Sequence, residues 1–283
     1  MITCNLMGGL GNQLFQIFTT INYSLLSKNP FKFLNIKTLG IGTTTIRNTY
    51  WESFLIKLKP FLLPSFNSKL EIIKEKDFTY NEIKLIDISN KNICLYGYFQ
   101  SYKYFEKNFE VIYKLLNINN IKNQIKNKLE YNSNFYNETV SMHFRLGDYK
   151  KIQDYHPIQP YQYYKNSLNH IYNYDKDVIN ILFFCEDDDL DDVTIIIEKL
   201  QNDFSLTKYN FIKIKSDLQD WEQLLIMSCC KHNIIANSTF SWWGAYLNNN
   251  RYKIVCYPHL WFGSLTKNNT KDLFPNTWIK INY

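Results

Sequence analysis

The chain has 283 residues, 45% of them hydrophobic, so it is long enough for one large or two moderate domains around a substantial core. Its net charge of +6 is spread along the sequence without a dense lysine or arginine block, which argues against a nucleic-acid-binding face. The six cysteines form no C-x-x-C pair, which argues against zinc and favours small buried side chains in a reducing compartment.

The first half of the chain begins with apolar and amphipathic runs in alternation, the pattern of an α/β fold. The stretch from Gly40 to Leu63 is aromatic and basic, and its pattern gives no clear assignment. The elements expected in this half are a strand at Ile2 to Leu6, a helix at Leu14 to Leu26, a strand near Ile93 to Phe99, a helix from about Tyr102 to Leu116 and a polar helix at Ile121 to Leu129.

A glycine-rich turn separates the first strand from the first helix. It contains Gly8, Gly9 and Gly11, followed by Asn12. A strand, a glycine turn and a helix in this order let the backbone approach a ligand closely. The spacing lacks the later glycine of the dinucleotide fingerprint, and a purely structural turn remains the alternative.

The second half alternates strands and helices more regularly, which predicts a parallel sheet. The change of pattern near residue 135 suggests two Rossmann-like halves. The expected elements are strands at Thr139 to Phe144, Val178 to Cys185, Asn233 to Ala236 and Lys253 to Tyr257, and helices at Tyr161 to Tyr172, Asp191 to Leu200, Leu218 to Ser228 and from Ser241 onward.

Two polar segments follow expected strands of this half. Alternation places His143 and Arg145 on one face at a strand end, where open α/β sheets bind ligands, and arginine suits a phosphate or carboxylate. Asp148 would fix that guanidinium or contact a substrate, and a buried Arg–Asp pair that closes a loop is the alternative. The stretch Asn237 to Ala245 places side-chain donors and free N–H groups at a helix start, which suits a phosphate; an ordinary N-cap is the alternative.

Together, these segments resemble the motifs of the alpha-1,2-fucosyltransferase family, glycosyltransferase family 11. The three motifs are Gly8 to Gln16, His143 to Tyr149 and Asn237 to Ala245, in the family's order. Weaker matches lie at Gly97 to Ser101, at Glu186-Asp187 and at Met227 to His232. The family's central motif usually has a second arginine where this chain has Leu146, which puts donor affinity or substrate preference in doubt.

The resemblance implies a GT-B-like α/β fold with two Rossmann-like domains facing a cleft. Residues 1–135 would form the acceptor-side domain and residues 136–260 the GDP-sugar-binding domain, with a tail at 261–283 packing back on the first half. The reaction implied is inverting transfer of L-fucose from GDP-fucose to the 2-hydroxyl of a terminal galactoside. The family is generally metal-independent, so we expect no cofactor and no metal site, with Arg145, the Ser238 and Thr239 hydroxyls and a helix N-terminus meeting the leaving group's charge.

The site residues follow from the matched motifs. Arg145 and Asp148 would be catalytic, and the expected donor-binding residues are Gly11, Asn12, His143, Arg145, Asp187, Asn237, Ser238, Thr239 and Ser241. The aromatic residues Tyr98, Phe99 and Trp51 are the candidates for contact with the acceptor sugar, although core packing explains most aromatics in this chain.

Several alternatives stay open at this stage. The run Glu186 to Asp189 would recognise guanine through Glu186 or Asp187, form a solvated helix start, or hold a metal ion. Asp148 is the nearest motif carboxylate for a general base. A strong base is unnecessary if the diphosphate departs well before the acceptor hydroxyl attacks. A different GDP-sugar or linkage, or a catalytically inactive glycan-binding protein, would also fit. The lack of a signal peptide or membrane anchor before the first motif predicts a cytoplasmic, bacterial- or viral-type protein.

Overall fold

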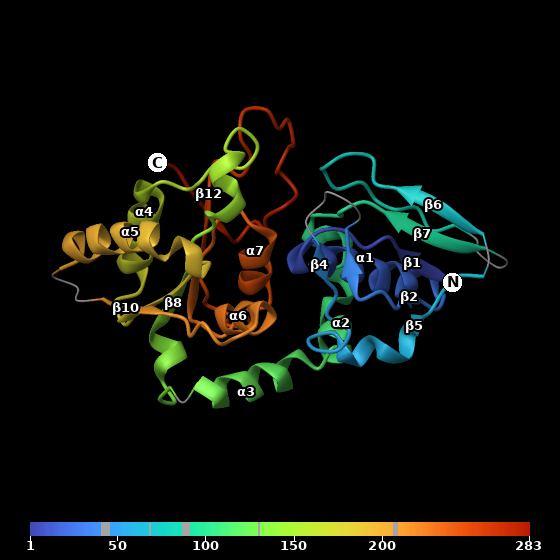
Figure 1. Cartoon of the computed structure of the whole chain (residues 1–283), viewed down its shortest axis with the longest axis horizontal. Helices are drawn as coiled ribbons and strands as arrows, with labels where there is room; N and C mark the ends of the chain where they lie inside the picture. Colours follow the sequence, from blue (N-terminus) through green and yellow to red (C-terminus); the bar gives the residue numbers. More distant parts are fainter. Residues whose placement is uncertain (41–45, 68, 87–90, 130, 206–208) are drawn as a thin grey trace. The chain divides into compact units, whose positions relative to one another are not determined.

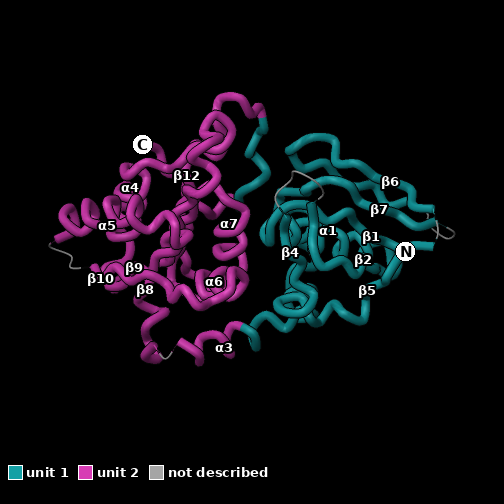
Figure 2. Tube along the Cα trace, in the orientation of Figure 1, with its two compact units in different colours: residues 1–121, 268–275 teal, residues 122–267, 276–283 magenta. Residues whose placement is uncertain are grey.

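The computed structural model describes residues 1–40, 46–67, 69–86, 91–129, 131–205 and 209–283. It contains two compact units: unit 1 comprises residues 1–121 and 268–275, and unit 2 comprises residues 122–267 and 276–283 (Figure 2). Each unit combines helices with a parallel sheet, so the predicted α/β class is confirmed. Residue 135, where the sequence suggests a boundary, lies within unit 2, and the expected tail 261–283 is shared between the two units.

Among the described residues of unit 1, three strands form a parallel sheet in the order β1-β7-β6 (Figure 1). A parallel bridge from Ile2 to Phe31 leads from β1 towards the pair formed by β2 and β5. The strands of this unit are β1 (Ile2–Cys4), β2 (Phe33–Leu34), β3 (Thr38–Leu39), β4 (Arg47–Asn48), β5 (Leu62–Leu63), β6 (Leu70–Lys74) and β7 (Asn92–Tyr96).

The main helix of unit 1 is α1 (Leu10–Ser27), which begins directly after the glycine turn and is buried over most of its length. The expected single helix from Tyr102 to Leu116 is wrong, because the backbone at Phe105 (φ −141°, ψ −3°) interrupts the helical geometry. The segment instead forms the 3-10 helices η2 (Tyr102–Tyr104) and η3 (Glu106–Asn108) and the short helix α2 (Phe109–Leu115), and η1 (Ile56–Phe61) lies earlier in the chain.

In the described part of unit 2, six strands form one parallel sheet in the order β10-β9-β8-β11-β12-β13. The chain builds outward from β8 in one direction, then returns to the other side of β8 and builds outward again. Open α/β sheets with this order bind ligands outside the carboxyl ends of the two strands where the direction reverses, here β8 and β11. The strands are β8 (Thr139–His143), β9 (Asn180–Phe184), β10 (Asn210–Lys213), β11 (His232–Ile234), β12 (Val255–Pro258) and β13 (Ile279–Ile281).

The helices of unit 2 pack around a core that includes Val140, Tyr164, Ile181 and Val193. The long helices are α4 (Tyr161–Tyr174) and α5 (Leu190–Asp203), the shorter ones are α6 (Asp220–Met227) and α7 (Thr239–Tyr246), and α3 (Ile118–Leu129) begins in unit 1; the 3-10 helices are η4 (Phe135–Glu138), η5 (Gly147–Lys151) and η6 (Asp187–Asp189). None of the described helices combines the length and apolar character that a bilayer crossing requires.

Candidate functional site

The polar residues singled out in the second half of the sequence gather at the carboxyl edge of the unit 2 sheet. His143 ends β8, Glu186 follows β9, and Asn237 follows β11. Because β8 and β11 are the strands at which the order reverses, this edge is the ligand-binding position of the fold. The topology therefore brings together two motifs that lie about 90 residues apart in the sequence.

Arg145 is the central cation of this edge. Its guanidinium forms ion pairs with the carboxylates of Asp148 and Glu186, and its side chain is 21% exposed. The two carboxylates are 54% and 57% exposed, so water screens both pairs and each contributes little stability. An incoming phosphate can therefore replace a carboxylate on the guanidinium at a small cost, with the same two-pronged geometry.

Tyr149 and His156 extend this site, and sequence reasoning gave His156 no role. The Arg145 guanidinium lies 5.0 Å from the centre of the Tyr149 ring, and the His156 ring stacks on Tyr149 at 4.8 Å with an interplanar angle of 20°. The Nδ1 atom of His156 is buried without a hydrogen-bond partner among the described residues. Its signal in the sequence was only a histidine thirteen residues after His143 in a loop, which is too weak to single out.

His143 is nearly buried, with 8% of its surface exposed, and its Nδ1 atom lacks a hydrogen-bond partner within the described part of the chain. Burial, and to a smaller extent the charge of Arg145, lowers the pKa of His143 to about 3. The imidazole is therefore neutral at pH 7. A buried polar atom without a partner is uncommon, and at a ligand-binding edge it indicates a place for a ligand hydrogen bond.

The late motif forms the turn between β11 and α7. Ser238 is the N-cap of α7, and its Oγ accepts a hydrogen bond from the Phe240 N–H at 3.3 Å. Ser238 and Thr239 are half-buried, so their polar atoms can meet a ligand at the helix N-terminus. Ser241 is buried and donates to the carbonyl of Ala236 at 3.4 Å, which stabilises the turn itself.

Asn237 connects the same turn to two loops. Its Nδ2 atom donates to the carbonyl oxygens of Pro157 at 2.9 Å and Trp261 at 3.1 Å. Its Oδ1 atom is buried without a hydrogen-bond partner among the residues that the structure describes. The amide thus has a structural role through Nδ2 and retains an acceptor at the edge where His143 also has an unpaired nitrogen.

In unit 1, the glycine turn is held by two buried glutamines of α1. The Nε2 atom of Gln13 donates to the carbonyl oxygen of Gly8 at 3.0 Å. Gln16 pairs with Met7, accepting from its N–H at 2.9 Å and donating to its carbonyl at 3.3 Å. Gly8 has φ +75°, and a Cβ atom there would lie 2.5 Å from the Asn12 Nδ2 atom, so a side chain does not fit. The glutamines of the motif therefore explain the shape of its glycine turn.

Two expected donor-binding residues lie in this turn. Gly11 is buried within the first turn of α1, whereas Asn12 is half-buried and its Oδ1 atom accepts a hydrogen bond from Gln100 at 3.0 Å. A Cβ atom built on Gly9 would meet nothing within 4 Å, so there is open space over the turn. A ligand can approach the backbone there, as the order of strand, glycine turn and helix in the sequence predicts.

The three expected acceptor-contacting aromatics differ in exposure. Trp51 and Phe99 are 2% and 1% exposed, and Trp51 stacks on Phe33 within the core. Tyr98 is 41% exposed. Tyr98 is therefore the candidate whose ring is open to a sugar, while Trp51 and Phe99 pack against protein.

A family model described as glycosyl transferase family 11 matches residues 1–282. The chain belongs to glycosyl transferase family 11. The resemblance seen in the sequence motifs is thereby confirmed, and the chain is a glycosyltransferase whose reaction requires a nucleotide sugar and an acceptor.

Two proteins of Escherichia coli are similar to this family 11 member along their whole length. The O-antigen biosynthesis glycosyltransferase WbnK is 28% identical over 321 residues, covering 99% of this chain and 100% of WbnK. An alpha-1,2-colitosyltransferase is 26% identical over 301 residues, covering 99% of each chain. Among solved structures, E. coli ADP-heptose lps heptosyltransferase II matches with a TM-score of 0.37 and 10% identity, covering 57% of this chain and 43% of that one.

The acidic run of this glycosyltransferase is held by cations from its own unit. Asp187 pairs with Lys213 and also accepts from Ser216 at 3.1 Å, and the hydrogen bond from Lys213 lowers the pKa of this carboxyl. Asp189 accepts from the Gly147 N–H at 2.7 Å and pairs with Lys150 at 2.8 Å. No cluster of three or more potential metal-ligating side chains occurs within the described ranges.

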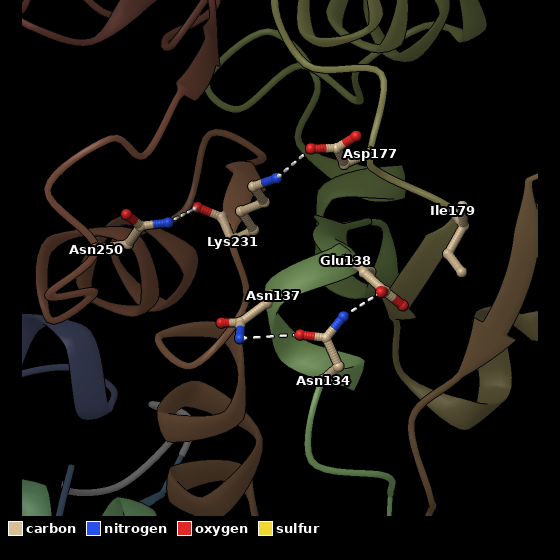
Figure 3. Close-up of a pocket in the computed structure, with 7 residues that line it drawn as sticks. All are labelled: Asn134, Asn137, Glu138, Asp177, Ile179, Lys231 and Asn250. Carbon is tan, nitrogen blue, oxygen red and sulfur yellow. Dashed lines mark hydrogen bonds and ion pairs between the residues drawn. The ribbon is translucent and has the colours of Figure 1, made fainter.

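A separate cavity of about 470 Å³ lies at the opposite edge of the unit 2 sheet (Figure 3). Glu138, Ile179 and Lys231 line it, and each directly precedes β8, β9 or β11. Polar groups around it pair with one another, as where Asn250 donates to the Lys231 carbonyl at 3.2 Å (Figure 3). Because ligands of open α/β sheets bind at the carboxyl ends of the strands, this cavity is not the candidate donor site.

Proposed function

We propose that this family 11 glycosyltransferase transfers L-fucose from GDP-fucose to the 2-hydroxyl of a terminal galactoside, with inversion. The observation that carries the proposal is the meeting of the central and late family motifs at the carboxyl ends of β8 and β11. A half-buried arginine, a neutral buried imidazole and a helix N-terminus lie together there. This combination suits a nucleoside diphosphate.

The proposed roles follow from that edge. Arg145 and the N-terminus of α7, with Ser238 and Thr239, bind the diphosphate and stabilise the negative charge that grows as it departs. His143 lies beside the nucleoside, and Asn237 and Ser241 shape the turn. Asp148 pairs with Arg145, which supports an orienting role for this carboxylate more than a role as general base.

The other expected donor and acceptor contacts are part of the same proposal. Asp187, after β9, accepts hydrogen bonds from the guanine, and Lys213 keeps it ionised for this purpose. The glycine turn with Gly11 and Asn12 offers backbone to a substrate on unit 1, where Tyr98 provides an exposed ring for a sugar. We also propose that the enzyme acts in the cytoplasm.

A second candidate keeps the same site and changes the transferred sugar. One relative of similar length is named an alpha-1,2-colitosyltransferase, and colitose is L-fucose without its 3-hydroxyl. The chain also departs from the family pattern at position 146, where leucine stands in place of the usual arginine. A buried group that pairs with the 3-hydroxyl would discriminate strongly between these two donors.

The test is acceptor-dependent release of GDP from GDP-fucose, GDP-colitose and GDP-mannose with lactose, N-acetyllactosamine and simple galactosides. We expect turnover with GDP-fucose and a product that an alpha-1,2-fucosidase cleaves. Turnover with GDP-colitose alone would establish the second candidate. EDTA should leave the rate unchanged, because Arg145 and the α7 N-terminus meet the leaving-group charge; loss with EDTA and recovery with Mn²⁺ would assign the acidic run to a metal.

A further inference from the structure

His156 lies in the loop that follows η5, and the residues that contact it belong, like His156 itself, to unit 2. Its imidazole stacks on the Tyr149 ring, with 4.8 Å between the ring centres. The Arg145 guanidinium lies 5.0 Å from the centre of the same ring. The charges of Arg145 and Asp148 both act on the imidazole. His156 is therefore a close neighbour of the cation in the proposed donor site.

Two loops of unit 2 fix the position of this imidazole. The ring of Phe262, in the second loop, lies 5.8 Å from the ring of His156. The Gly263 N–H donates a hydrogen bond to the Tyr155 carbonyl oxygen at 2.9 Å. A Cβ atom on Gly263 would lie 2.2 Å from the Asp154 carbonyl oxygen, so only glycine lets the two loops approach so closely. The place of His156 thus results from packing on both sides of its loop.

The two ring nitrogens of His156 have different surroundings. Nδ1 is buried and has no hydrogen-bond partner among the described residues, whereas Nε2, which also forms no hydrogen bond within the described ranges, is not buried. Burial lowers the pKa of His156, so the ring is neutral at pH 7 and carries one proton. A buried N–H group without an acceptor is costly, so we assign the proton to Nε2. The exposed Nε2–H group is then free to donate to a ligand.

We propose that His156 is a donor-binding residue whose Nε2–H group donates a hydrogen bond to a phosphate oxygen of the nucleotide sugar; this rests on the proposed function. Arg145 supplies charge to the diphosphate, and His156 adds a neutral donor of fixed direction. Because both groups lie against the Tyr149 ring, a diphosphate that meets the guanidinium comes within reach of the imidazole.

The residue next to Arg145 cannot make this second contact. Leu146 is 5% exposed and belongs to the apolar core of unit 2. It has no polar side-chain atom to offer a phosphate. Among the residues around Arg145, His156 combines an unpaired ring nitrogen that reaches solvent with a position fixed by packing.

Two substitutions separate a hydrogen bond from simple packing. His156→Phe keeps a flat ring against Tyr149 and loses the donor, so we expect the affinity for GDP to fall about tenfold. His156→Gln loses the stacked ring but keeps an N–H donor, and its affinity should stay above that of His156→Phe. A folded His156→Phe protein that binds GDP within threefold of wild type would overturn the proposal, because packing alone would then explain the residue.

The matched control is His170→Phe, on α4. The His170 ring also lies against a tyrosine, 4.9 Å from the ring of Tyr174. This variant should bind GDP as the wild type does. The melting temperature of each variant shows whether it is folded under the conditions of the titration.

Inorganic pyrophosphate and guanosine test the two parts of the nucleotide separately. His156→Phe should weaken binding of pyrophosphate by about the same factor as binding of GDP, and should leave binding of guanosine unchanged. An equal loss for guanosine would overturn the proposal, because it would place His156 beside the base. A wild type that binds pyrophosphate but not GDP would correct the proposed nucleotide, and loss of pyrophosphate binding in His156→Phe would still support the role of His156.

Nuclear magnetic resonance gives a second readout in the wild-type protein. The chain has five histidines, so labelling them with nitrogen-15 gives few ring signals, and those of His156 are absent from the His156→Gln spectrum. Saturation with GDP or pyrophosphate should shift the Nε2 signal of His156. An Nε2 signal that stays in place when the wild type is saturated with GDP would overturn the proposal.

Discussion

The hydroxyl of Tyr149 donates a hydrogen bond to the backbone carbonyl oxygen of Asn237 at 3.2 Å. This bond joins the central motif after β8 to the late motif after β11, 88 residues further along the chain. The same ring lies against the Arg145 guanidinium and stacks on His156. Tyr149 thus connects the cation of the proposed donor site to the turn that begins α7.

Two substitutions distinguish the contribution of the Tyr149 hydroxyl from the contribution of its ring. Tyr149→Phe keeps the ring contacts and should lower the unfolding free energy by about 1 kcal/mol, with kcat reduced less than tenfold. Tyr149→Ala also removes the surface that orients Arg145 and should weaken GDP binding further. Urea unfolding and GDP titration measure both effects. Tyr155→Phe, on a half-exposed ring in the same loop, is the control, and equal losses in Tyr149→Phe and Tyr149→Ala would contradict the role of the ring.

Arg145→Ala should reduce kcat at least about 100-fold, because the growing charge of the diphosphate loses its main cation. Its two ion pairs are with half-exposed carboxylates, so their loss should change the melting temperature little. Arg145→Lys should recover only part of the activity, since an ammonium group cannot form the two-pronged contact. Arg251→Ala, an exposed site in the same unit, is the control. A folded and fully active Arg145→Ala enzyme would remove Arg145 from the mechanism.

His143 makes the stability of the protein sensitive to acid. Its folded-state pKa of about 3 lies below the unfolded value near 6.5, so protonation favours the unfolded chain. Its contribution is fully present above pH 6.5 and is lost as the pH falls towards 3. In that window the unfolding free energy of the wild type should fall about 1.4 kcal/mol per pH unit more steeply than that of His143→Gln.

Urea unfolding at several pH values measures this difference in slope. His170→Gln is the control, because His170 lies partly exposed on α4 and keeps contact with water. Parallel curves for the wild type and His143→Gln would show that folding leaves the pKa of His143 unchanged.

The local sequence pattern was sufficient to predict the elements that form the carboxyl edge of the unit 2 sheet, where we propose that the donor binds. The amphipathic run from Tyr161 and the apolar run before Cys185 correspond to α4 and β9, and the Asn/Ser/Thr stretch before Trp242 starts α7 as expected. The positions of glycine and proline and the spacing of apolar residues predict such elements from the local sequence alone. The fold class and the meeting of His143, Arg145 and Asn237 at one sheet edge follow from these elements and parallel topology.

The elements that were missed depend on contacts far away in sequence. β6 contains only partly exposed and exposed residues, and it forms because it pairs with β7, more than twenty residues later. β13, near the C-terminus, exists because it adds to β12. Sequence pattern cannot show which strand such a segment will pair with, and so neither β6 nor β13 was predicted. His156 was not predicted for a similar reason, because its place in the site depends on the stacking of its ring on Tyr149.

Leu146 occupies the position where the family pattern usually has a second arginine, and it is 5% exposed within the apolar core of unit 2. Leu146→Arg should therefore destabilise the protein by about 2 kcal/mol or more, because the guanidinium would lack a partner among these apolar side chains. It should not strengthen GDP binding. Leu146→Met, of similar volume, should cost less than about 1.5 kcal/mol and serves as the control. Thermal unfolding and GDP titration distinguish the cases: tighter GDP binding by Leu146→Arg at an unchanged melting temperature would mean that this position faces the diphosphate.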